Sequence, residues 1–321
     1  MSAEKISNFF LPLFMALFCA FLLLNPREVS EAALSGAALW KDAVFPSLFP
    51  FLVGANLMLQ LDFARRAGFL RLLCRALFGL PESGALGVFC GFTSGYPVGA
   101  KVAADLYRER LLTRRQAERL MACANNSGAA FVTGALGAGM FGSPAAGWFI
   151  LFIHYLGAVL LGLLLRAMDN EPPSPPRTPP GSRKKQPPFA QAFTYSVKNA
   201  VETILQIGGF LVLFSVAVKI LRLAGAFRAM PPFAAAIATG LVEVTSGCAA
   251  LSAGGANKPA IIAAAALVSF GGLSVCAQSA NFLRDTDLSL GRYVFRKALH
   301  AVITALLGLL LEPLWAGARR L

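Results

Sequence analysis

Long apolar runs alternate along this chain with short polar and basic segments. Residues 145–167 are apolar except for His154 and Arg166, and residues 301–311 form a continuous apolar run. About 20 apolar residues are needed for a helix to cross the hydrocarbon core of a bilayer, so this pattern predicts membrane-spanning helices. A transmembrane barrel would require short alternating segments instead. The predicted uninterrupted spans are residues 9–24, 44–61, 144–167, 200–221 and 293–315.

Short polar sequences that contain glycine interrupt the apolar pattern at four places. Residues 91–95 and 125–128 do so in the first half of the chain, and residues 243–247 and 271–274 in the second half. Irregular backbone at membrane depth persists only where it is buried in protein or lines a watery cavity. Interruptions at corresponding places in two halves therefore indicate a transporter binding site. The alternative is that small residues only allow close packing of membrane helices.

These interruptions predict two kinds of element. The first one in each half is expected at the tip of a re-entrant helical hairpin, and the second one divides a span into two half-helices. Thr113 and Gln116 fit a capping box that starts the first broken span, and Ser143 before Pro144 fits the start of the following span. The sequence thus predicts an all-α polytopic membrane protein with about seven transmembrane helices and two re-entrant hairpins.

The same pattern divides the chain into four parts. An N-terminal transmembrane helix and an amphipathic connector occupy residues 1–43, and the first repeat occupies residues 44–168. A proline-rich basic linker follows at residues 169–190 and is too polar to pack, so we expect it to be cytoplasmic. Residues 191–321 form the second repeat. Lys and Arg are more frequent in the loops placed inside, which puts the N-terminus inside and makes the two repeats inverted.

Composition and charge narrow the class of function. The chain has 321 residues, of which 56% are hydrophobic, and a net charge of +13. The basic residues lie in short loops between apolar runs rather than on one soluble face, so we expect a lipid bilayer and no nucleic acid as partner. The sequence contains no hydrolase motif, metal-ligand cluster or P-loop, so we expect no enzyme activity, catalytic residue, metal or bound cofactor. A coupling Na⁺ or H⁺ remains open. The six scattered cysteines are expected to be small core residues.

The helix interruptions also predict the chemistry of the ligand. A helix that starts at mid-membrane presents unsatisfied amides with a partial positive charge, and these suit an anion. A small carboxylated or otherwise polar solute fits such a chamber. The predicted substrate-binding residues are Thr93, Ser94, Gly95, Asn125, Asn126, Ser127, Gly128, Glu243, Thr245, Ser246, Gly247, Ser274 and Gln278.

The ionisable residues within the apolar segments include Glu243, His154 and His300. An ionised Glu243 would cost several kcal/mol in lipid, so it is expected to face the cavity. There it can bind a coupling ion, hydrogen-bond the substrate, pair with Lys101 or Lys258, or simply hydrogen-bond a broken helix end. His154 and His300 are the only histidines. We expect both to be hydrogen-bonded core residues, with a proton relay as the alternative.

Four motifs together resemble the sporulation integral membrane protein family typified by YlbJ, within the wider group of nucleoside-recognition gate domains. They are GFTSGYPVGAK at residues 91–101, NNSG at 125–128, GLVEVTSG at 240–247, and FGGLS at 270–274 with Gln278. The resemblance covers nearly the whole chain.

This resemblance implies a fold similar to concentrative nucleoside transporters. It also implies transport of dipicolinate, a small pyridine dicarboxylate, from mother cell to forespore across the mother-cell membrane that surrounds the forespore. Relatives with gate domains often form oligomers, so a homo-oligomer is compatible with it. A nucleoside transporter of the same fold and a non-transporting sporulation scaffold are the alternative functions.

Overall fold

The computed structural model describes residues 16, 18–61, 68–169 and 187–318. The structure is 83% helical, and the described residues contain no strand, which confirms the all-α prediction. Half of the predicted first span, residues 9–24, and most of the predicted linker, residues 169–190, lie outside the described residues.

The described helices have 5 to 16 residues, except for three of 25, 35 and 29 residues that begin at Pro144, Phe189 and Leu290. Two of them, η1 and η2, have π-helical hydrogen bonding. In chain order they are α2 (Pro26–Leu39), η1 (Trp40–Val44), α3 (Phe45–Gln60), α5 (Gly68–Phe78), α6 (Gly84–Thr93), α7 (Val98–Arg108), α8 (Arg114–Ala124), η2 (Phe131–Met140), α9 (Pro144–Met168), α10 (Phe189–Leu223), α11 (Pro232–Val242), α12 (Val244–Ser252), α13 (Lys258–Phe270), α14 (Gly272–Leu283) and α15 (Leu290–Ala318).

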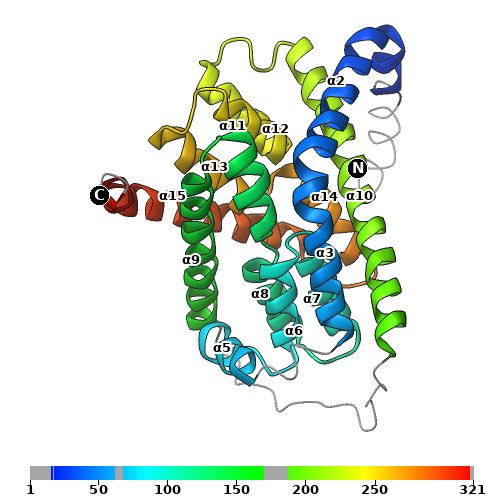
Figure 1. Ribbon diagram of the computed structural model, residues 1–321, viewed down its shortest axis with the longest axis vertical. Coiled ribbons are helices and arrows are strands. Elements are labelled where there is room, and N and C mark those ends of the chain that lie inside the picture. Colours follow the sequence, from blue (N-terminus) through cyan, green and yellow to red (C-terminus); the bar gives the residue numbers. More distant parts are fainter. Residues whose placement is uncertain (1–15, 17, 62–67, 170–186, 319–321) are drawn as a thin grey trace, which may run out of the picture.

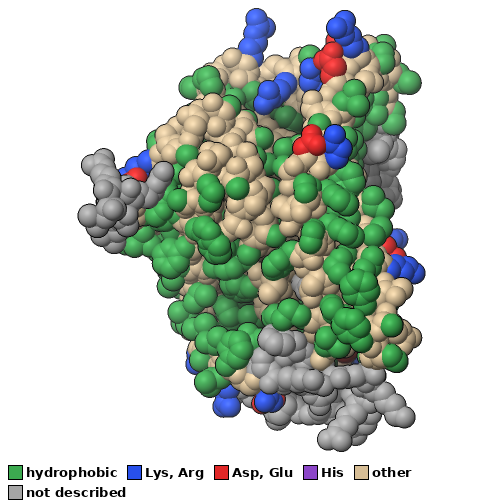
Figure 2. Space-filling model, in the orientation of Figure 1, with side chains coloured by type: hydrophobic (Ala, Val, Ile, Leu, Met, Phe, Trp, Pro, Cys, Tyr) green, Lys and Arg blue, Asp and Glu red, His purple; other side chains and the backbone are tan. Residues whose placement is uncertain are grey.

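Four helical segments of the described chain are long and apolar enough to cross a membrane. They are α9, α10, the segment Lys258–Leu283 that combines α13 with α14, and Leu290–Pro313 of α15. These segments correspond to the last four predicted spans, although α10 starts at Phe189 instead of residue 200. The predicted span at residues 44–61 is shared between the end of η1 and α3. Hydrophobic side chains cover much of the visible face, and Lys and Arg lie mainly toward the two ends of the long axis (Figure 2).

The helices are not arranged as a simple parallel bundle (Figure 1). Helices α2, α3, α9 and α10 follow the long axis, whereas α15 runs across it in this view. Helix α10 packs against α2 and α3, and α15 packs against α13 and α9. Helices α5 to α8 gather at one end of the molecule and α11 to α13 toward the other (Figure 1).

Both predicted N-terminal caps are present. The Thr113 hydroxyl accepts from the Gln116 amide at 3.2 Å, and the Gln116 side chain accepts from the Thr113 amide at 3.0 Å. Ser143 Oγ accepts from the Ala146 amide at 3.2 Å, directly before Pro144. These contacts satisfy amides that have no partner within the helix, and so they fix where α8 and α9 begin.

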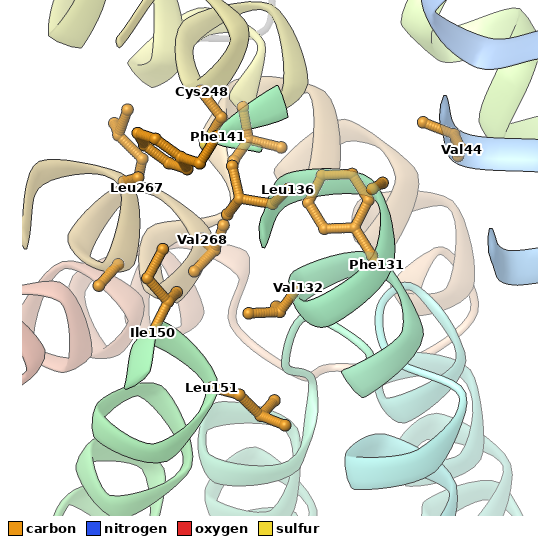
Figure 3. Packing of buried hydrophobic residues seen from close by; sticks show 14 of the residues in the cluster. Val44, Phe131, Val132, Leu136, Phe141, Ile150, Leu151, Cys248, Leu267 and Val268 are labelled. Carbon is orange, nitrogen blue, oxygen red and sulfur yellow. The ribbon is translucent and has the colours of Figure 1, made fainter. Parts of the chain in front are cut away.

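The largest hydrophobic cluster lies where η2, α9, α12 and α13 meet (Figure 3). Leu136 and Phe141 lie beside Cys248 and Leu267 there. Five of the six cysteines are buried and all six are free, as expected for small core residues; Cys19 is exposed. This packing holds the half-helix η2 against the second half of the chain.

Candidate functional site

The two interruptions of the first half contact each other. The Tyr96 amide donates to the Asn126 carbonyl at 2.6 Å, which joins the turn after α6 to the break after α8. Gly95 has φ +79°, and a Cβ there would lie 2.5 Å from the Gly128 nitrogen. A Cβ at Gly91 would lie 1.7 Å from the Ala124 carbonyl oxygen. Only glycine therefore permits this approach of two backbones.

The second half has the same local arrangement. Glu243 separates α11 from α12, and the paired glycines Gly271 and Gly272, with φ +89° and +73°, separate α13 from α14. A Cβ at Gly272 would lie 2.9 Å from the carbonyl oxygen of Gly240 in α11. In each half, a helix break thus lies against the preceding pair of helices. The break after α8 lies against α6 and α7, and the break between α13 and α14 lies against α11 and α12.

A small cavity lies where the two halves meet. Its volume is about 50 Å³, which is room for a few waters or one carboxylate group. Its wall combines polar groups with apolar side chains from η1, α3, η2 and α10. The lining residues are Val44, Leu48, Ser94, Tyr96, Ser127, Gly128, Phe131, Ile207, Leu211, Glu243, Val244, Thr245, Ser274, Val275 and Gln278.

Two hydroxyls of this wall have no hydrogen-bond partner among the described residues. Ser127 Oγ and the Tyr96 hydroxyl are both buried and lie near each other, and neither makes a hydrogen bond of ordinary geometry. A buried polar group without a partner costs about 1–3 kcal/mol, so native proteins rarely retain one without a reason. The two hydroxyls mark the part of the cavity wall that is suited to a polar ligand.

The cavity brings together seven of the thirteen predicted site residues, three from the first half and four from the second. The seven are Ser94, Ser127, Gly128, Glu243, Thr245, Ser274 and Gln278. Ser274 and Gln278 both line it, as the one-turn spacing on a helix predicts. Tyr96 lies within a motif noted in the sequence but is not among the predicted site residues.

The other predicted residues do not line the cavity, and they stabilise the turns and helix contacts around it. Thr93 Oγ1 donates to the Phe89 carbonyl of its own helix at 2.6 Å. Gly95 forms the turn, and Gly247 allows α12 to approach α11, where its Cβ would lie 2.1 Å from the Gly240 Cα. Ser246 Oγ lies 3.4 Å from Ser215 Oγ of α10.

Asn125 and Asn126 hold the first break in place. Asn125 Oδ1 accepts from the Ala100 amide at 3.1 Å, and its Nδ2 donates to the Tyr293 hydroxyl at 2.7 Å. Asn126 Nδ2 donates to the Cys123 carbonyl at 2.7 Å. Neither residue is among those that line the cavity, and both position the break in this structure; their predicted contact with a substrate stays a prediction.

Glu243 lines the cavity and caps α12. Its Oε1 accepts from the Thr245 amide at 3.0 Å and its Oε2 from the Ser246 amide at 2.6 Å. A carboxylate is favourable at this position because a helix N-terminus carries partial positive charge. The proposed pairing with Lys258 or Lys101 is wrong, because Lys258 pairs with Glu312 at 2.8 Å and Lys101 is exposed.

A buried lysine behind the first break was missed in the sequence. The Lys297 ammonium is fully buried and lies 3.0 Å from the Asn125 carbonyl, 3.3 Å from Asn126 Oδ1 and 3.0 Å from His300 Nδ1. A positive charge suits the end of α8, where carbonyls lack partners within the helix. The rule that charged residues inside a spanning helix are functional would have singled out Lys297.

Both histidines are buried and hydrogen-bonded, as predicted. His154 Nε2 accepts from the Ser127 amide at 3.1 Å, and its Nδ1 lies 2.7 Å from Ser269 Oγ. His300 Nε2 lies 2.9 Å from the His154 carbonyl. The two rings are stacked with centroids 5.0 Å apart. They connect the first break to α9, α13 and α15.

Together the fold and the site define a helical integral membrane protein whose interrupted helices enclose a polar cavity between two halves. The chain is similar to the sporulation integral membrane protein YlbJ of Bacillus subtilis (strain 168), with 28% identity over 356 aligned positions that cover 99% of this chain and 86% of the relative. This match confirms the resemblance to the YlbJ family that the motifs indicated. It supports a membrane location and a membrane role in sporulation. No protein-family model and no solved structure matches the chain.

Proposed function

We propose that this protein transports a small carboxylated metabolite, with dipicolinate as the substrate, from the mother cell toward the forespore during spore formation. The observation that carries the proposal is the cavity between the two halves, with its unpartnered Tyr96 and Ser127 hydroxyls. Pairs of interrupted helices that meet around a polar site are typical of secondary transporters.

The start of α14 supports an anionic ligand. Gly271 provides no side-chain cap for this helix, and Ser274 of its first turn lines the cavity. The amides of an uncapped helix N-terminus attract negative charge. Gly128, which precedes the half-helix that contains η2, lines the same cavity. Amide and hydroxyl donors from both halves can therefore surround a carboxylate, and the Glu243 carboxylate on the same wall is already bonded to the Thr245 and Ser246 amides.

The size of the cavity has a consequence for the transport cycle. A volume of about 50 Å³ accommodates a carboxylate group but not a whole pyridine dicarboxylate. The walls must separate for the substrate to enter, as alternating access requires. The boundary between η2 of the first half and α12 and α14 of the second is where this separation is expected, because the cavity lies on it.

The experiment is uptake of radiolabelled dipicolinate into proteoliposomes that contain the full chain. Ser127→Ala and Tyr96→Phe each remove one unpartnered hydroxyl and should lower uptake about 10–100-fold, the loss expected for a hydrogen bond to a charged ligand. Ser252→Ala and Tyr195→Phe are the matched controls. Ser252 Oγ bonds the Ala249 carbonyl of its own helix, Tyr195 is half exposed on α10, and neither lines the cavity.

Three outcomes separate the functions that remain. The proposal is supported if dipicolinate uptake falls in the two cavity variants and stays at the wild-type level in the two controls. Uptake that excess uridine abolishes, or uptake of uridine itself, replaces the proposed substrate with a nucleoside. Purified protein that takes up neither compound, even with a pH or Na⁺ gradient imposed, contradicts transport and favours the scaffold function.

A further inference from the structure

His154 connects the cavity to a buried series of hydrogen-bonded side chains that do not line the cavity. On one side its Nε2 accepts the amide of Ser127, a residue of the cavity wall. On the other side its Nδ1 contacts Ser269 Oγ at 2.7 Å, and Ser269 lies 2.9 Å from Thr304 Oγ1. His154, Ser269 and Thr304 are fully buried. One imidazole therefore connects the ligand site with α13 and α15.

The fixed donors and acceptors determine the protonation of both rings. The Ser127 amide can only donate, so His154 Nε2 carries no proton and Nδ1 donates to Ser269. The His154 carbonyl can only accept, so His300 Nε2 carries a proton and Nδ1 accepts from Lys297. In the structure both rings are therefore neutral, and they are opposite tautomers.

A proton on His154 conflicts with the closed arrangement. The free position for it is Nε2, which would become a donor that faces the Ser127 amide, another donor. The ring and the amide must then separate. The amide released in this way belongs to the cavity wall, where it can donate to a carboxylate.

We propose that His154 is the proton-binding site of this transporter. When Nε2 binds a proton, the Ser127 amide stops donating to the imidazole and donates instead to a carboxylate of the substrate. The proposal rests on the proposed function, since it supplies the coupling ion for the same cavity. One proton and one anion then bind together, and each favours the other. The step transfers a proton only, from water to Nε2, and no covalent bond between heavy atoms changes.

The charged and titratable groups around His154 make its protonation depend on a bound anion. The titratable groups that face His154 are His300 and Lys297, both from α15, and Tyr155 from α9 itself. From α13 it meets Ser269, and from the break before η2 it meets Ser127. Helix α8 places Cys123 toward Lys297, and α14 places Cys276 there. Helix α5 contacts α9 through Phe78 at Gly162, two turns away.

When Lys297 carries a proton, it opposes a second positive charge nearby, because charges in the membrane interior are screened weakly. Among the described residues, no Asp or Glu contacts the His154 ring. The Glu243 carboxylate on the wall of the cavity is bonded to the Thr245 and Ser246 amides, so an anionic substrate is the further charge that offsets the protonated ring, and this makes proton binding depend on the substrate. By linkage, substrate affinity depends on the proton to the same degree.

The first test observes the two rings directly. The chain contains only two histidines, so protein labelled with ¹⁵N-histidine and held in lipid gives two imidazole signals. His154→Gln assigns them by removing one. We expect opposite neutral tautomers at pH 8 without ligand. With dipicolinate, the His154 signal should become doubly protonated at least one pH unit higher than without it, which corresponds to tenfold tighter binding of the anion to the protonated form.

The second test measures transport. A pH gradient with the acid side outside should raise dipicolinate uptake by wild-type protein several-fold. His154→Gln, which retains an acceptor for the Ser127 amide but does not titrate, should lose this stimulation and bind dipicolinate more weakly, with an affinity that no longer depends on pH. Two results would refute proton coupling and leave the proposed function standing. One is a pH gradient that stimulates His154→Gln as strongly as wild type. The other is a His154 signal that does not change with dipicolinate although calorimetry detects binding. Absence of both binding and exchange in wild type refutes the proposed function, and the coupling with it.

Discussion

Replacing Lys297 with methionine tests whether the buried polar network stabilises the first helix break. Methionine has a similar length and keeps the apolar stem, but it removes the ammonium that lies near Asn125, Asn126 and His300. Because Lys297 is 0% exposed, water cannot replace the lost donor without opening the helix packing. We expect a destabilised protein in which the break after α8 is the first region to open.

The magnitude follows from the three acceptors that lose their donor. Hydrogen bonds between membrane helices contribute about 1 kcal/mol each, and an unsatisfied buried acceptor costs about 1–3 kcal/mol. Part of this cost is offset, because methionine avoids the desolvation of a buried ammonium. A net loss of about 3 kcal/mol is therefore expected. It corresponds to a fall in Tm of on the order of 5 °C or more for a chain of this size.

The assay is thermal unfolding of purified protein in detergent, followed by intrinsic fluorescence. Lys198→Met on α10 is the matched control, because Lys198 is exposed, and its Tm should remain within about 1 °C of wild type. Hydrogen exchange at residues 120–130 should increase in Lys297→Met alone. A Lys297→Met protein as stable as the control would refute the view that this network holds the break together.

Three further predictions concern other parts of the structure. Gly91→Ala should lose about 3 kcal/mol or more, measured as yield and Tm, because its Cβ would lie 1.7 Å from the Ala124 carbonyl oxygen. Glu118→Gln should lose about 1–3 kcal/mol in the same assay, because a carboxylate that is 1% exposed pairs with Arg292 at 3.0 Å and with two further arginines. Tyr107→Phe should reduce the acid sensitivity of stability. The Tyr107 hydroxyl, 2.6 Å away, holds the pKa of Asp287 below its ordinary value. This contribution is present above the unfolded pKa of about 4 and disappears as pH falls through the folded pKa.

Two of these predictions have a control variant in the same chain. Gly209→Ala on α10 meets nothing within 4 Å and should leave Tm unchanged. Glu31→Gln disrupts an ion pair whose side chains are 88% and 56% exposed, so its effect should stay within about 0.5 kcal/mol. For Tyr107→Phe, a Tm difference from wild type that is the same at pH 3 and pH 7 would contradict the role given to Asp287.

The ends of the helices could be predicted because local chemistry determines them. The capping box at Thr113 and the cap at Ser143 act within four residues, so the sequence contains all of their partners. The break at Gly271 and Gly272 follows from backbone conformations that glycine adopts most readily. The apolar length of α9 and α15 likewise predicts long membrane helices from the sequence alone.

Only the tertiary structure decided which polar side chains face the cavity. Asn125 and Ser127 belong to one motif, yet Asn125 turns away because Ala100, Ser279 and Tyr293 supply its partners. Lys297 reaches the same break from 172 positions further along the chain. Contacts at such separations depend on how helices pack, and a local pattern does not contain them. The sequence by itself therefore determined that helices break at these four places, and packing between the halves determined what each break does.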